Sequence, residues 1–95
     1  MSSHFVMKLQ FRLHGCASLK EKRSRLANLL NKLKKENVSV IESDRQDDHQ
    51  FAEICIAKMS LDTNKLHRDH DQLLDFIETH RGDIDLIHYE TERFY

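Results

Sequence analysis

The chain has 95 residues, of which 39% are hydrophobic and 33% charged, and its formal net charge is −1. This length supports one domain over residues 1–95 with one modest core, because a chain of this size buries roughly 60 to 65% of its unfolded surface. No apolar run approaches the ~20 residues of a membrane span, and the opening MSSHFVMKLQF lacks the pattern of a signal peptide, so we expect a cytoplasmic protein with no membrane segment.

The first part of the chain predicts a strand followed by a helix. Apolar and polar residues alternate strictly over 5–13, which is typical of a strand with one buried face. Ser18 is followed three residues later by Glu21, the spacing of a helix capping box. Leucines then recur at helical spacing, and we expect a helix over about 19–36.

The middle of the chain predicts a hairpin and a second helix. Two β-rich runs, 37–44 and 51–59, flank the polar stretch RQDDHQ, as in two strands joined by a turn. Asp62 or Thr63 then caps a helix whose core-facing side includes leucines and His70.

The end of the chain completes the fold. Arg81-Gly82 predicts the end of the second helix, since glycine readily adopts the left-handed conformation of a helix stop, and 83–95 predicts the last strand. The order β-α-β-β-α-β predicts a ferredoxin-like split β-α-β fold of the α+β class, with a four-stranded mixed sheet and two helices on one face. The other face of the sheet is expected to stay open.

Positive charge is concentrated in the first predicted strand and helix. Residues 1–36 hold nine Lys and Arg against two Glu, whereas the remainder holds six against fourteen acidic residues. Four basic side chains of the helix are scattered outside its leucine arc, as on a solvated face: Lys20, Arg25, Lys32 and Lys35. Lys22 and Arg23 differ, because they project within or beside that arc, towards one end of the sheet.

A cation in the first turns of a helix is unfavourable by up to about 1 kcal/mol, so an anion should compensate for Lys22 and Arg23. One alternative is an external phosphate or carboxylate held at the helix start. The other is internal, since the hairpin lies at the same end of a split β-α-β sheet. Its carboxylates are those of Glu42, Asp44, Asp47 and Asp48.

Two surfaces are therefore candidates for binding. An anion or nucleic-acid site would use Ser18, Lys20, Lys22 and Arg23, with Lys8 and Arg12 from the first strand. An interface for a second copy or a partner protein would use the open sheet face, where we expect Phe51, Cys55, Ala57 and Met59, with Tyr89 or Ile87 beside them. The aromatic signature of an RNA recognition motif is missing from this face.

No cofactor, metal or catalytic site is expected. His67 and His70 have chelating spacing beside Asp71, but no third and fourth ligand is evident. Cys16 and Cys55 are far apart and form no CxxC pair. With only two glycines the chain cannot form a glycine-rich phosphate loop, which favours a non-enzymatic module over a small phosphatase.

Several stretches resemble one protein family. SLKEKR at 18–23, NVSV at 37–40 and Gln46-Asp47 in the hairpin are similar to the YlxP-like family of small bacterial proteins of unknown function. The resemblance implies a ferredoxin-like fold and association with RNA or the ribosome. His49 stands where that family usually has Trp, and SLD at 60–62 replaces a common Ser-Asn-Asp.

Overall fold

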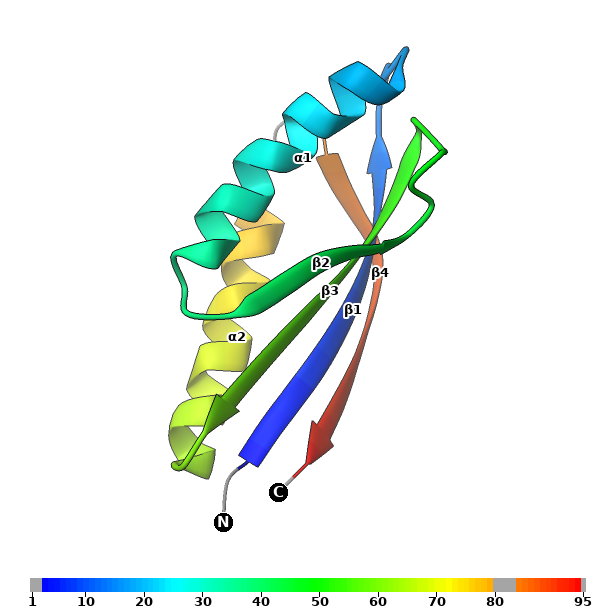
Figure 1. The fold of residues 1–95 in the computed structure, drawn as a ribbon. Coiled ribbons are helices and arrows are strands. Elements are labelled where there is room, and N and C mark those ends of the chain that lie inside the picture. The colour runs from blue at the N-terminus through cyan, green and yellow to red at the C-terminus, as the bar shows by residue number, and fades with distance from the viewer. Residues whose placement is uncertain (1–2, 80–83, 95) are drawn as a thin grey trace.

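The computed structural model describes residues 3–79 and 84–94, and their elements follow in the predicted order (Figure 1). The predicted helix stop at Arg81-Gly82 and the outer residues of the predicted last strand, Asp83 and Tyr95, lie outside the described residues. The elements are β1 (Ser3–Leu13), α1 (Leu19–Lys34), β2 (Ser39–Asp44), β3 (Phe51–Ser60), α2 (Thr63–Thr79) and β4 (Ile84–Phe94).

The four strands form one sheet in the order β2-β3-β1-β4, and both helices cover the same face (Figure 1). This is the predicted α+β ferredoxin-like arrangement. The predicted mixed pairing is wrong, because all three neighbouring pairs are antiparallel. Each β-α-β unit brings its two strands back parallel, but a strand of the other unit lies between them.

The core lies between the helices and the inner face of the sheet. Alternate residues of β1, from Phe5 to Leu13, are at most 2% exposed, as the alternation predicts. β3 contributes Ala52, Ile54 and Ile56, which are fully buried. Each large apolar side chain buried in this way contributes about 1.5 to 3 kcal/mol. The helices contribute Leu26, Leu29, Leu33, Leu66, Leu73 and Ile77.

Side chains cap both helices at their N-termini. Ser18 Oγ accepts a hydrogen bond from the Glu21 backbone N–H at 3.1 Å, which confirms one half of the capping box. The other half is shifted, since Glu21 accepts from the N–H of Ala17 at 2.8 Å. Asp62 caps α2 by accepting from the N–H groups of Asn64 and Lys65. Neither described helix is both long and apolar enough to span a membrane.

A β-bulge changes which residues of β4 face outwards. Gln10 pairs with His88, but the next residue of β1 pairs with Leu86, so Ile87 has no partner in the register. Tyr89 pairs with the buried Leu9 and therefore lies on the helix side of the sheet. Of the two residues that we gave as alternatives for the open face, Tyr89 or Ile87, Tyr89 is therefore wrong, because residue spacing alone does not reveal a bulge.

Candidate functional site

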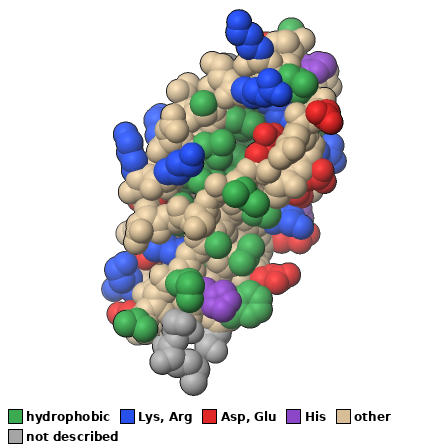
Figure 2. Space-filling model, in the orientation of Figure 1, with side chains coloured by type: hydrophobic (Ala, Val, Ile, Leu, Met, Phe, Trp, Pro, Cys, Tyr) green, Lys and Arg blue, Asp and Glu red, His purple; other side chains and the backbone are tan. Residues whose placement is uncertain are grey.

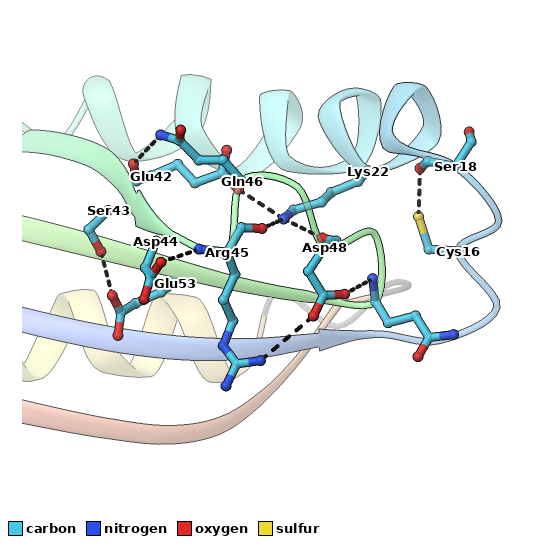
Figure 3. A network of polar contacts seen from close by, with 11 residues as sticks. Cys16, Ser18, Lys22, Glu42, Ser43, Asp44, Arg45, Gln46, Asp48 and Glu53 are labelled. Atoms are coloured by element: carbon cyan, nitrogen blue, oxygen red, sulfur yellow. Dashed lines mark hydrogen bonds and ion pairs between the residues drawn. The ribbon is translucent and has the colours of Figure 1, made fainter.

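The start of α1 is joined to the β2–β3 hairpin by the buried side chain of Lys22. This lysine is 1% exposed, and its ammonium group donates to the carbonyl oxygens of Arg45 at 2.5 Å and Asp48 at 2.6 Å (Figure 3). Glu42 Oε2 lies 3.0 Å from the same nitrogen, as an ion pair without the alignment of a hydrogen bond. A buried ammonium needs such partners, because desolvating an unpaired charge is very unfavourable.

The hairpin loop is shaped to present these two carbonyl groups. Arg45 has a positive φ of 59°, and its carbonyl also accepts from the N–H of Asp48 at 3.1 Å. The Asp44 carboxylate accepts from the N–H of Arg45, and the Asp48 carboxylate from that of Gln50. The carboxylates of Asp44 and Asp48 therefore hold the loop rather than Lys22. Of the predicted acidic partners, Glu42 contacts the ammonium group, and two backbone carbonyls, which we did not predict, accept its hydrogen bonds.

We gave two alternatives for the anion that compensates Lys22 and Arg23, an external ligand or the hairpin. The structure shows the hairpin as the partner of Lys22. Its ammonium group already has three oxygen neighbours and almost no exposure to solvent. Ser18 likewise uses its hydroxyl as the helix cap. Arg23 is exposed, and its side chain has no hydrogen bond or ion pair with the residues the structure describes.

A network of polar contacts that we did not predict fixes the turn between β1 and α1. Arg25 donates to Glu21 at 2.6 Å and to the carbonyl of His14 at 2.7 Å. His14 in turn contacts the carboxylate of Asp85 on β4. We expected Arg25 on a solvated face, but its side chain is only 16% exposed. The i,i+4 spacing of Glu21 and Arg25 was the signal for this pair.

The outward surface of α1 is basic. The helix carries six basic residues and one acidic residue, and that acid is Glu21, which pairs with Arg25. Lys20, Arg23 and Lys34 are exposed. Helical spacing places Lys20 on the side opposite the buried leucines, Arg23 beside the leucine arc, and Lys34 between them. Figure 2 shows Lys and Arg side chains spread over the part of the surface that α1 forms.

The structure does not bring Lys8 and Arg12 together with the basic residues of α1. Both are exposed on the open face of the sheet, whereas α1 covers the opposite face. Their register partners on β4 are acidic, Glu90 beside Lys8 and Asp85 beside Arg12. The predicted six-residue set is therefore divided between two faces and a buried network.

The open face has an apolar part, as predicted. Cys55 and Ala57 are half-buried and Met59 is exposed, while Phe51 lies under the guanidinium of Arg45, 5.2 Å from its ring centre. The register also places the exposed side chains of Val6, Ile41 and Phe94 on this face.

The histidines do not form a metal site in the part of the chain that the structure describes, where no group of three or more His, Cys, Asp or Glu has a suitable arrangement. His70 is 4% exposed and lies 2.9 Å from the Thr91 hydroxyl of β4. Its ring also packs edge-on against Phe5. His70 thus joins α2 to the sheet.

Stability should fall in acid because three carboxyl groups have lowered pKa values in the folded protein. The Ala17 N–H and Arg25 lower the pKa of Glu21, and the Gln50 N–H lowers that of Asp48. Burial acts to raise the pKa of Asp69, but hydrogen bonds from Lys58 and Lys65 outweigh it and lower that pKa.

In the unfolded chain these carboxyl groups have the ordinary pKa values of 4.5 for Glu and 3.8 for Asp. As the pH falls, the unfolded chain therefore binds protons at these groups before the folded protein does. We expect the free energy of unfolding to be constant near neutral pH and to decrease progressively below about pH 5. Urea unfolding at a series of pH values measures this. In Asp69→Asn the decrease should be smaller, and an unchanged decrease would contradict the role of Asp69.

Comparisons with known proteins identify a family and a fold. The family model described as "Protein of unknown function (DUF503)" matches residues 5–91. No curated protein matches the chain. A solved structure titled "De novo designed protein Foldit4" is similar with a TM-score of 0.53, at 16% identity over 97% of each chain, and at that identity the likeness concerns the fold alone. The chain therefore belongs to the DUF503 family of proteins of unknown function.

Proposed function

We propose that this protein is a cytosolic, non-enzymatic module that binds RNA through the outward surface of α1. The observation that carries the proposal is the charge of that helix, six basic residues against one acidic, with Lys20, Arg23 and Lys34 exposed. A basic helix surface attracts the phosphate backbone of nucleic acids. The resemblance of residues 18–23, 37–40 and 46–47 to the YlxP-like family implies the same class of partner.

The residue types of α1 favour contacts with phosphates over contacts with bases. The helix contains no aromatic residue on which a base could stack. From Lys20 to Lys34 it extends about 20 Å, long enough to follow several phosphates. We therefore propose that the ligand is folded, double-helical RNA, read by its backbone and shape, as on a ribosomal surface.

The affinity for RNA should depend steeply on salt. With about four phosphate contacts, we expect affinity for a duplex RNA of about 16 base pairs to fall roughly a hundredfold between 50 and 200 mM salt. Fluorescence anisotropy with a labelled duplex measures this, and a single strand of the same length serves as the comparison. Absence of duplex binding at about 50 mM salt would exclude the proposal.

A second candidate function is self-association or protein binding through the open sheet face. The observation in its favour is that Val6, Ile41, Met59 and Phe94, all at least 38% exposed, share this face. Contiguous exposed apolar surface commonly marks an interface. Light scattering over a range of concentrations tests it: a dimer that Met59→Lys dissociates would support this function, and a monomer at high concentration would argue against self-association.

A further inference from the structure

The outer edge of β4 has no neighbouring strand among the described residues. β4 is the last strand of the sheet and, within residues 3–79 and 84–94, pairs with β1 alone. No described residue pairs with its other edge, which extends over the 11 residues Ile84–Phe94. The backbone N–H and C=O groups on such an edge can pair with a further strand.

A groove lies beside this edge, between β4 and the C-terminal part of α2. Two adjoining hollows of about 500 and 280 Å³ share Glu78, Leu86 and Ile87 as lining residues. The buried side chains of Ile77 and Ile84 form the base of the larger hollow. Because side chains of a strand alternate between two faces, a strand added to β4 would direct every second side chain towards this groove.

The surroundings of the groove are acidic. α2 and β4 together carry seven acidic and three basic residues, the reverse of α1. Glu78 and Asp85 line the hollows. Asp71, 79% exposed, lies farther along α2, and Glu90, 69% exposed, projects from β4 on the open face beside Lys8. An extended segment that alternates basic and apolar residues would complement both the charge and the apolar floor.

We propose that the β4 edge and this groove bind an extended, Lys- or Arg-rich segment of a partner protein as a fifth strand. Its backbone pairs with β4, its apolar side chains enter the groove between α2 and β4, and its basic side chains face the surrounding carboxylates. This site is distinct from the RNA surface of α1, so one molecule can hold RNA and a basic protein segment together.

The test uses a fluorescent peptide of about seven residues, the usual length of a strand, in which Lys and Val alternate. We expect it to bind the full chain, and a peptide that alternates Glu and Val to bind at least about tenfold more weakly. The third peptide is the Lys/Val peptide with methyl groups on alternate backbone nitrogens, chosen so that it cannot donate hydrogen bonds to β4. We expect it also to bind at least about tenfold more weakly. Equal binding of the three peptides would overturn the proposal.

Two matched variants locate the binding site. Ile87 and Ile41 are isoleucines on the two edge strands, 53% and 62% exposed. We expect Ile87→Lys to weaken binding of the Lys/Val peptide by about tenfold and Ile41→Lys to change it by less than about twofold. Circular dichroism checks that both variants fold, and Ile87→Lys should retain RNA binding. Equal effects of the two substitutions would overturn the proposal.

An NMR titration of the unsubstituted protein gives the answer even if a variant fails to fold. The Lys/Val peptide should shift the backbone amide signals of β4 and of Glu78, and leave those of β2 in place. Shifts confined to β2 would overturn the proposal. So would concentration-dependent changes in the β4 signals without peptide, since they would mean that a second copy of this chain occupies the edge.

Discussion

Replacing Lys22 by methionine is expected to lower the free energy of unfolding by about 3 kcal/mol, because removing one partner of a buried polar network leaves the others unpaired. Methionine retains an unbranched apolar side chain but removes the ammonium group. The carbonyl groups of Arg45 and Asp48 and the carboxylate of Glu42 would then lose their common partner. For a domain of this size the loss corresponds to a fall in Tm of roughly 12 to 24 °C.

Lys20→Met is the matched control for this prediction. Lys20 is in the same turn but exposed, so its replacement should change the free energy of unfolding by less than about 0.5 kcal/mol. Urea or thermal unfolding compares the two variants. If Lys22→Met were as stable as the unsubstituted protein but had lost RNA binding, Lys22 would serve an external anion and the internal network would not be its role.

Reversing the charge of Lys20 and Arg23 together is expected to weaken binding of duplex RNA at low salt by about thirtyfold or more, because two phosphate contacts become repulsive. The dependence of log affinity on log salt should become shallower by about two. Loss of folding does not explain such a result, since Glu near the N-terminus of a helix is favoured by the helix dipole.

The comparison variant for this prediction is Lys8→Glu with Arg12→Glu. These residues provide the same two charges, but on the opposite face of the sheet and beside Glu90 and Asp85. Anisotropy measurements at 50 and 200 mM salt should show a much smaller effect for this pair. If it weakened binding as much as Lys20→Glu with Arg23→Glu, RNA would bind across the open face instead.

The order and faces of the elements were predictable because alternation, helical spacing and capping residues are local signals. Phe5 to Leu13 alternate and Ser18 precedes Glu21, and each pattern is found where the sequence places it. The antiparallel pairing needed a further step, namely that the strands of the two β-α-β units interleave.

The details of the candidate site were less predictable because they depend on backbone geometry. The position of Lys22 in the leucine arc indicated that it points towards one end of the sheet, and the structure has it there, bonded to the hairpin. Lys22 bonds to backbone carbonyls because Arg45 has a positive φ and begins a turn that presents these carbonyls. Neither feature can be read from the sequence. The bulge at Ile87 likewise leaves no clear pattern in the sequence, although it decides the side on which Tyr89 lies.

The most direct test of RNA binding by α1 is an NMR titration of the isotope-labelled protein with a duplex RNA at about 50 mM salt, where phosphate contacts are strong. We predict that the amide signals of α1, above all around Lys20, Arg23 and Lys34, shift or broaden while those of β1 and β3 remain in place. Shifts centred on β1 and β3, or no shifts at all, would contradict the proposed function.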